Sequence, residues 1–432
     1  QVGIDHFATI AHPTIKLFWA SVLFDNSGSS PEILAFLRKA LDSKSDAGVL
    51  REMSGPNFQA FRERVIRTYG IGRKTRVELV KKHDMEPLPP FGNGSGYKRS
   101  SARLTQGPAL LAVRPVKQQG ELIIRDLKTG KTSTRPIPQP AGFKPQFDFV
   151  SYFDDPVLTI NKNGDLFILW TIGGNGDHGI AMLKKGADAF LVKRVKLELA
   201  NCLVVPDPSG NWYLISGAPR CTVHRVTDEL KLVAIGEFAG RGHHNTDVLD
   251  ACFLSRNVLH LFWGDVLAGG NHLRMRCVDF DVTDKKWLHD REIYRLDKFV
   301  SSANRPTVLQ LANGSLHYQW HVNEGERPSA ASGLYYLAES ENKQIKLANS
   351  YQNCAVRAGD HIISCYTLDN APDKVFFRVI SHGVPGPITE IVASKQALWT
   401  ENLLLHFDGE RIWFMNSLAT QALYELKLSD SK

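Results

Sequence analysis

Residues 155–170 read DPVLTINKNGDLFILW, and the pattern of this stretch decides the fold. An apolar run is followed by a polar turn around Gly164, and a second apolar run ends at Trp170. Apolar runs on either side of a glycine-containing turn predict two antiparallel strands with a tight connection. Glycine suits the turn because it adopts positive φ at little cost. The stretch is therefore a predicted β-hairpin.

Six further stretches follow the same plan. They are PALLAV with QQGELII, NCLVVPDPSGNWYLIS, NTDVLDACFLSRNVLHLFW, NRPTVLQLANGSLHYQW, NCAVRAGDHIISCY and NLLLHFDGERIWFM. The seven turn residues, 44 to 57 positions apart, are Gly120, Gly164, Gly210, Asn257, Gly314, Gly359 and Gly409. Each interval has room for four short strands. Seven such units predict an all-β fold, a seven-bladed β-propeller.

The chain ahead of the repeats has a different character. We divide it into residues 1–96, a mostly helical segment with a linker, and residues 97–432, the propeller. Helical spacing of apolar residues begins at Pro31 and recurs over 57–69 and 74–83, whereas residues 14–24 fit either a strand or a buried helix. The last repeat lacks a fourth strand. Residues 98–104 are expected to supply it and so close the ring.

Composition allows a large core and sets the charge. The chain has 432 residues, 43% of them apolar, and a formal net charge of +7. Residues 1–99 hold 15 Lys and Arg against 10 Asp and Glu, so most of the excess charge lies there. A weakly basic surface favours acidic partners such as anionic glycans or nucleic acid. No run of 18 apolar residues occurs, which argues against a membrane-spanning helix.

The cysteines and the first residue of the sequence indicate in which cellular compartment the protein is expected. Cys202, Cys252, Cys277 and Cys365 lie in apolar strand-like runs and are interpreted as buried thiols, although a disulfide stays open for a secreted protein. A removed signal peptide would explain a start at Gln1, as would a cloning boundary. We expect a secreted or periplasmic monomer.

Polar residues gather at one end of the predicted blades. In a propeller, the loops that enter strand one and those that join strands two and three share a face, opposite the tight turns. The polar loops on that face are 152–155, 173–178, 241–245, 264–272, 301–305 and 321–327. Loops on a rigid scaffold commonly carry binding residues, so this face is the expected binding surface.

Two of these loops belong to one hairpin. Residues 240–276 read GRGHHNTDVLDACFLSRNVLHLFWGDVLAGGNHLRMR, and strand pairing brings the start of this stretch beside the loop that ends at His272. His244 and His272 are the candidate catalytic residues of this face. The candidate substrate-binding residues are His243, Asn245, Arg274, Arg305, His321, Asp155 and His178.

Other histidines and tryptophans are interpreted as structural. His260 and His317 occupy the same register in their strands. Trp170, Trp263 and Trp320 end second strands, where we expect them to pack between blades rather than bind sugars.

Two alternatives concern a metal and nucleic acid. No cofactor is expected, yet a divalent metal held by the histidines with Asp247 or Asp265 stays open, because no ligand spacing here is diagnostic. Residues 69–75, YGIGRKT, resemble the turn of helix-hairpin-helix DNA-binding motifs. A plain packing element is the preferred interpretation, and nucleic acid is disfavoured as a partner.

The pattern HHNT…LHLFWG…GGNHLRMR resembles the BNR-like propellers of the sialidase superfamily, in particular those that contain ulvan-type polysaccharide lyases. There a His-Asn pair begins one strand and a second His precedes another strand of the same blade. The resemblance therefore implies active-site positions at His244, Asn245 and His272. It covers one blade well and residues 108–428 in outline. The Ser-x-Asp-x-Gly-x-x-Trp box of true sialidases is absent, which disfavours sialidase activity.

These residue types suit the removal of a proton beside a uronate carboxylate. The charge of that carboxylate must be neutralised, which Arg305 or Arg274 can do together with Asn245. A base that titrates near neutrality is also needed, and histidine is such a base. The expected function is therefore a polysaccharide lyase that cleaves an anionic, uronate-containing glycan by β-elimination.

The roles within that reaction are shared among three side chains. His244 or His272 takes the proton, and the other histidine, or Tyr318, donates one to the leaving oxygen. The same groups fit a His-dependent glycoside hydrolase. Without any chemistry they fit a propeller that binds glycan or protein.

Overall fold

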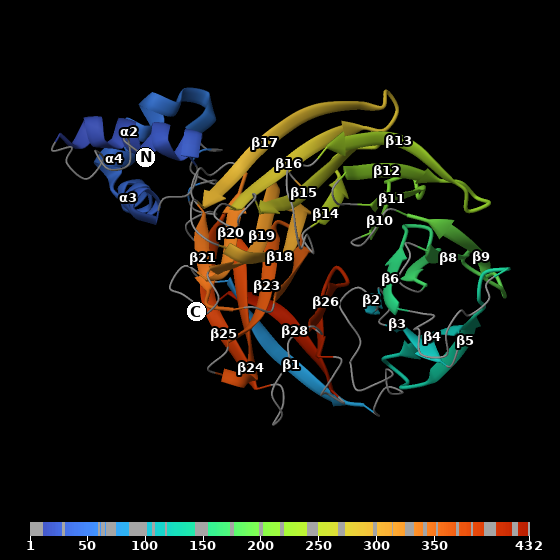
Figure 1. Ribbon diagram of the computed structural model, residues 1–432. Coiled ribbons are helices and arrows are strands. Elements are labelled where there is room, and N and C mark those ends of the chain that lie inside the picture. Colours follow the sequence, from blue (N-terminus) through green and yellow to red (C-terminus); the bar gives the residue numbers. More distant parts are fainter. Residues whose placement is uncertain are drawn as a thin grey trace.

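The computed structural model contains seven four-stranded antiparallel sheets arranged in a ring, with a small helical unit at its side (Figure 1). The described residues are 12–27, 31–58, 61, 65, 75–85, 102–105, 109–116, 119–142, 154–172, 177–197, 202–216, 220–239, 249–266, 273–296, 300–312, 314–324, 332–339, 344–350, 353–368, 371–381, 383–392, 403–416 and 422–430. A seven-bladed propeller is thus confirmed.

We number the blades along the chain, each from its innermost strand outward. Blade 1 consists of β2 (Ala102–Thr105), β3 (Ala109–Val116), β4 (Gln119–Asp126) and β5 (Thr132–Ile137). Blade 2 consists of β6 (Asp154–Ile160), β7 (Leu166–Thr171), β8 (Asp177–Leu183) and β9 (Leu191–Lys196). Blade 3 consists of β10 (Cys202–Pro206), β11 (Trp212–Ser216), β12 (Arg220–Val226) and β13 (Leu232–Ala239).

The remaining blades follow the same order, except that the last takes a strand from the start of the chain. Blade 4 consists of β14 (Leu249–Phe253), β15 (Val258–Val266), β16 (Leu273–Asp281) and β17 (Lys286–Leu296). Blade 5 consists of β18 (Val300–Gln310), β19 (Leu316–Glu324), β20 (Gly333–Ala338) and β21 (Ile345–Ala348). Blade 6 consists of β22 (Asn353–Ala358), β23 (His361–Leu368), β24 (Ala371–Ser381) and β25 (Val384–Val392). Blade 7 consists of β26 (Leu403–Phe407), β27 (Ile412–Asn416), β28 (Ala422–Asp430) and β1 (Thr75–Asp84).

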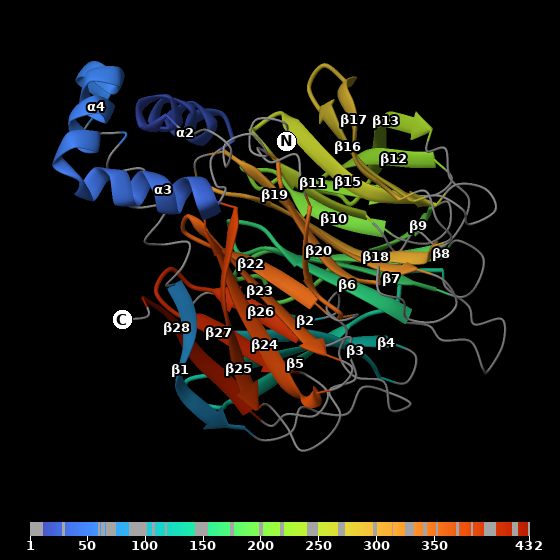
Figure 2. The same cartoon turned by 90° about the vertical axis from the view of Figure 1, so that its left-hand side faces the viewer.

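The closing strand differs from the prediction in two respects. Residues 75–84, expected as part of a helix, form strand β1, which pairs antiparallel with β28 from Thr75–Asp430 to Asp84–Ala422 (Figure 2). Residues 98–104 were expected to close the ring, but Ala102–Thr105 form β2, the innermost strand of blade 1. An outer strand is covered mainly on one side, so only Thr75 and Val77 of β1 are buried and the period-two pattern is weak. Strand pairing therefore begins ahead of the boundary expected between residues 96 and 97.

Most of the predicted turns are confirmed. Positive φ occurs at Gly164, Gly210, Gly314, Gly359 and Gly409, all in turns between first and second strands. Two predictions were wrong in detail. Asn257 does not have positive φ, because the Ser255 hydroxyl accepts from the amides of Asn257 and Val258 and holds that turn. The hairpin around Gly120 joins the second and third strands of blade 1, because the four-residue strand β2 precedes it.

The core lies between the blades. Seven apolar clusters each combine side chains of two neighbouring blades, and one of them joins blade 7 to blade 1 through Leu404 and Leu110. Trp170, Trp263 and Trp320 are 1%, 8% and 0% exposed, so their predicted packing role is confirmed. Closure of the ring is therefore an apolar contact as well as a hydrogen-bonded one.

The helical unit has an apolar core of its own. It comprises α2 (Pro13–Ser27), α3 (Pro31–Asp42), α4 (Lys44–Ser54) and the 3₁₀ turn η1 (Gly55–Asn57). Residues 14–24 are helical, and the predicted helix from Pro31 is confirmed with Ile33 and Leu37 buried. Phe61 and Val65 join the same cluster. The motif-like residues 69–74 lie outside the described residues.

Gly179 gives a test of the packing between strands. A Cβ at Gly179 would overlap the indole ring of Trp170. Gly179→Ala should lower the free energy of unfolding by about 1–3 kcal/mol, the usual cost of overpacking. Gly48→Ala is the matched control, because nothing lies within 4 Å of a Cβ there. Alanine favours that helix, so the control should hold or raise stability in denaturant titrations. An unchanged Gly179→Ala midpoint would contradict the packing.

Candidate functional site

The structure describes only part of the predicted site. His243, His244, Asn245 and His272 lie outside the described residues. Asp155 and Arg305 are placed by their backbone, in β6 and β18. The side chains of Arg274, His178, His321 and Tyr318 are described.

Asp155 and Arg305 lie in equivalent irregularities of two innermost strands. In blade 2 the register passes from Asp154–Thr171 to Val157–Leu169, so Asp155 and Pro156 together lie opposite Trp170. A proline cannot donate to the strand ladder, and in sheets it is confined to edges and bulges.

The same two-to-one arrangement recurs in blade 5. The register passes from Asn304–His321 to Thr307–Gln319, so Arg305 and Pro306 lie opposite Trp320. Bulges of this kind redirect a strand and are frequent beside active sites. Two candidate binding residues thus occupy the same bulge position, Asp155 near the start of β6 and Arg305 in the middle of β18.

Two of the candidate histidines, His178 and His321, have side chains that the structure describes. His178 follows Asp177 at the start of β8, opposite Thr171, and is 4% exposed. His321 lies on β19 opposite Asn304 and is 3% exposed. Both are packed between strands, so neither presents its ring to solvent in this conformation.

Arg274 lies along the sheet and is partly engaged. Its Nη1 is 3.8 Å from Glu292 Oε2 on β17, and its side chain is 26% exposed. Its Nε is buried and has no hydrogen-bond partner among the described residues. The next arginine on the same face, Arg276, forms an ion pair with Asp290 and stacks over Phe238 and Trp263. Arg274 therefore has one buried N–H donor without a hydrogen-bond partner, whereas the Arg276 guanidinium contacts a carboxylate and two aromatic rings.

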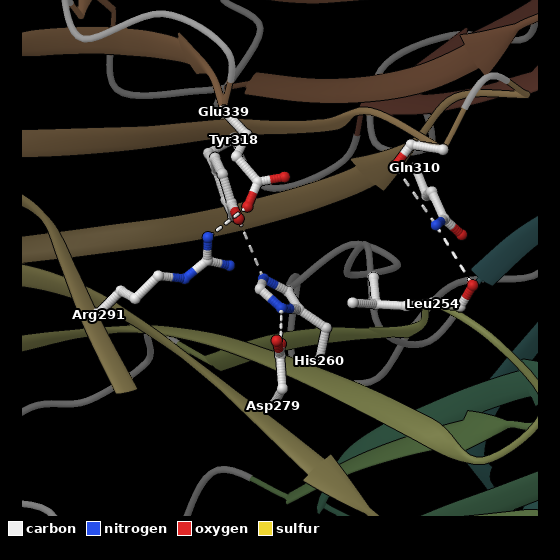
Figure 3. Close-up of polar contacts among 8 residues, drawn as sticks. Leu254, His260, Asp279, Arg291, Gln310, Tyr318 and Glu339 are labelled. Carbon is white, nitrogen blue, oxygen red and sulfur yellow. Dashed lines mark hydrogen bonds and ion pairs between the residues drawn. The ribbon is translucent and has the colours of Figure 1, made fainter. Parts of the chain in front are cut away.

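Tyr318 belongs to a buried network between blades 4 and 5 rather than to the rim (Figure 3). Its hydroxyl lies 3.2 Å from His260 Nε2, and His260 Nδ1 lies 2.6 Å from Asp279 Oδ1. Tyr318 is 1% exposed and His260 is 0% exposed. Burial raises the pKa of the Tyr318 hydroxyl far above its ordinary value, so this group stays protonated.

An ion pair and a second carboxylate complete this buried network. Arg291 on β17 forms an ion pair of 2.6 Å with Glu339, just after β20, and Figure 3 shows the pair beside the Tyr318 hydroxyl. Burial opposes ionisation of Asp279 most strongly, but the hydrogen bond to His260 and the charges of His260 and Arg291 together outweigh it, so the pKa of Asp279 lies below its ordinary value. The structural role predicted for His260 is confirmed, as is that of His317, which bonds to Tyr336 at 2.5 Å.

A second buried network, between blades 5 and 6, was missed by sequence reasoning. Gln319 Nε2 donates to Asn353 Oδ1 at 2.9 Å, and Ser364 Oγ donates to Gln319 Oε1 at 2.8 Å. These three side chains are 3%, 2% and 0% exposed. The available signal was weak: Asn353 begins NCAVR, as Asn304 begins NRPTV and Asn245 begins NTDVL.

Metal, membrane and thiol expectations can be compared with the described residues. Among them, no three His, Cys, Asp or Glu side chains are grouped so as to hold a metal ion. Asp247 lies outside the described residues, and the side chain of Asp265 is not described. None of the helices in the described part of the chain is long and apolar enough to span a membrane. All six cysteines are free, with Cys277 and Cys365 buried and Cys202 and Cys252 half-buried.

Comparisons with known proteins find similar folds and no sequence family. No family model matches the sequence, and no curated protein matches it. The polysaccharide lyase Uly1 is 12% identical with a TM-score of 0.47, and the alignment covers 83% of this chain and 100% of that one. An α-L-arabinanase from Penicillium chrysogenum is 14% identical with a TM-score of 0.45, covering 65% and 93%.

Proposed function

We propose that this chain is a carbohydrate-active propeller that binds an anionic polysaccharide at the rim where Asp155 and Arg305 lie, and cleaves it by β-elimination. The observation that supports this most directly is the pair of equivalent bulges. Each places a charged candidate residue before a proline in a bulge of an innermost strand. Because the two positions carry opposite charges, the rim offers one group for a carboxylate and one for hydroxyls.

The proposed chemistry starts from the acidity of the proton to be removed. A proton beside a carboxylate becomes removable when that carboxylate is neutralised, which we assign to Arg305 with Asn245. Arginine matches a carboxylate through two parallel N–H donors. Arg274, whose side chain is 26% exposed, is the second candidate for this role.

We assign the proton transfers to His244 and His272, one as base and the other as acid. Histidine titrates close to neutrality, so one ring can accept a proton while the other donates. Tyr318 was the other candidate donor. Its hydroxyl is sealed against His260 between two blades, so the second histidine is the donor that we propose.

Two alternatives use the same rim. A His-dependent hydrolase would add water across the glycosidic bond, and a non-catalytic propeller would bind glycan or protein without cleavage. The burial of Tyr318 favours the binding-only alternative, because it removes one of the three candidate proton-transfer groups from direct contact with a substrate. A secreted location also belongs to this proposal.

One screen separates the three. The protein is incubated with polygalacturonate, alginate, hyaluronate and ulvan, while the ultraviolet absorbance of the reaction and the number of reducing ends are followed. A lyase raises both, because β-elimination leaves an unsaturated uronate. A hydrolase raises only the reducing ends. Affinity electrophoresis that shows retention with neither signal would overturn the catalytic proposal and leave the binding one.

Arg305→Ala should weaken binding as well as turnover, because carboxylate neutralisation begins in the bound ground state. We expect a rise in KM and a fall in kcat, with kcat/KM lower by about 100-fold, the usual effect of losing one charge-stabilising donor. Arg305→Lys should recover only part of it, since a lysine lacks the paired donors. Initial rates on the uronate polymer give both constants. Unchanged constants in Arg305→Ala would remove Arg305 from the site.

A further inference from the structure

The bulge that carries Arg305 is bracketed on the facing strand by two buried polar residues. His321 lies opposite Asn304, just before the bulge, and Gln319 lies opposite Thr307, just after it. Residues two apart on a strand point to the same side of the sheet. The side chain of Gln319 reaches blade 6, so this side of β19 faces that blade.

Gln319 is fixed from both ends of its amide. Its Nε2 donates to Asn353 Oδ1 on β22, and its Oε1 accepts from Ser364 on β23. All three residues are at least 97% buried. One step further along β18, the backbone N–H of Val308 donates to Asp250 Oδ2 of blade 4 at 2.8 Å. The backbone that follows the bulge is thus bonded to blade 4, and the strand that faces it, β19, is bonded to blade 6 through Gln319.

Blade 2 shows that the bulge itself does not need this fastening. There the position of Gln319 is occupied by Leu169, which is 2% exposed and packs in an apolar cluster. The same Xaa-Pro bulge forms opposite Trp170 with that apolar neighbour. Replacing buried polar networks by apolar residues is often neutral for stability. Stability alone therefore does not explain why blade 5 has a hydrogen-bonded Gln319 where blade 2 has Leu169.

We infer that Gln319, held by Asn353 and Ser364, is a positioning residue for Arg305. It acts through Thr307, its cross-strand neighbour, by fixing where the bulge leaves the sheet. Arg305 then meets the substrate carboxylate at a set distance from the reacting carbon, and an error of about 1 Å in such a placement can cost about 100-fold in rate. This inference rests on the proposed function of Arg305 and specifies the ligand further. We call the hydrogen bonds of Gln319 to Asn353 and Ser364 the Gln319 clamp. The clamp should matter for the binding of a uronate carboxylate and not for the binding of its ester.

The test uses the full chain and two probes, trigalacturonate and its methyl ester, with affinity measured by calorimetry. The main variant is the apolar triple Gln319→Leu, Asn353→Leu and Ser364→Ala, which copies the apolar setting of blade 2. We expect its affinity for trigalacturonate to fall about tenfold, with the affinity for the ester unchanged. In an Arg305→Ala background the triple change should cause no further loss, because both act through one contact.

Two further variants keep the result decisive. Ser364→Ala removes one hydrogen bond of the clamp with little change in shape, and should give a smaller loss of the same kind if the triple variant fails to fold. Ser381→Ala is the matched control: it removes another buried serine of blade 6, bonded to His361 at 2.8 Å, and should leave both affinities unchanged.

The possible failures are distinguishable. Equal losses for the acid and the ester, or losses that add to those of Arg305→Ala, would make the clamp merely structural and overturn the inference. If Arg305→Ala itself leaves trigalacturonate binding unchanged, or the wild type does not bind it, the proposed function of Arg305 fails instead.

Discussion

His244→Ala and His272→Ala are each expected to abolish turnover of the uronate polymer while leaving the melting temperature nearly unchanged. General acid–base catalysis by a positioned side chain contributes about 10²–10⁴-fold, and each histidine is assigned one of the two proton transfers. A side chain that reaches toward substrate contributes little to packing, so the stability cost should be small. Initial rates and thermal melts on the same preparations measure both.

His289→Ala is the control for this pair, because His289 is an exposed histidine of β17 outside the proposed site. It should retain full activity. Full activity in both site variants on a proven substrate would mean that the site lies elsewhere. A fall of several degrees in both melting temperatures would instead mean that the two histidines belong to a buried hydrogen-bond network.

Asp279→Ala should be among the most destabilising single changes in the propeller. It leaves the ring of His260, which is 0% exposed, without its partner at 2.6 Å, between two blades. Removing one member of such a buried pair costs about 3 kcal/mol, because the group left behind is neither solvated nor bonded. Asp228→Ala is the control, since it removes a carboxylate that is 83% exposed and paired at the surface with Lys184. That change should cost less than about 1 kcal/mol.

The effect of Asp279 should also depend on pH in a defined direction. The pKa of Asp279 is lowered in the folded protein, so its contribution is present above the unfolded carboxyl value of about 3.9 and is lost as the pH falls through the folded value. The stability difference between wild type and Asp279→Ala should therefore be constant near neutrality and shrink in acid. Urea titrations at a series of pH values measure it. A difference that stays constant down to the acid limit would show that the Asp279 charge does not matter.

The number of blades could be read from the sequence because the signal is local and repeated. Each hairpin combines a turn such as that at Gly164 or Gly210 with strands whose apolar residues are buried on both sides of the blade. Apolar segments and turns therefore follow one another at a regular interval along the sequence. The interpretation of Trp170 and His260 as packing residues rested on the same periodicity. The prediction that the polar loops share one face of the propeller followed only from the alternating direction of successive strands in a blade.

The closing strand was decided by tertiary structure. Residues 75–84 contain Val77, Leu79 and Val80 among charged residues, a pattern that fits one side of a helix as well as an outer strand. Their partner β28 lies at the other end of the chain, and only the completed ring brings the two together. No local propensity encodes a pairing of that range.

The polar networks were decided in the same way. Nothing near Tyr318 in the sequence indicates that its hydroxyl meets His260 of the preceding blade, or that Gln319 meets Asn353 of the next one. Alternate residues of β19 face different blades, so adjacent residues of one strand enter unrelated networks. The sequence by itself determined the fold and the candidate residues at the rim. Which polar side chains are sealed between blades was settled by the packing of one blade on the next, because burial depends on partners that lie far away in the chain.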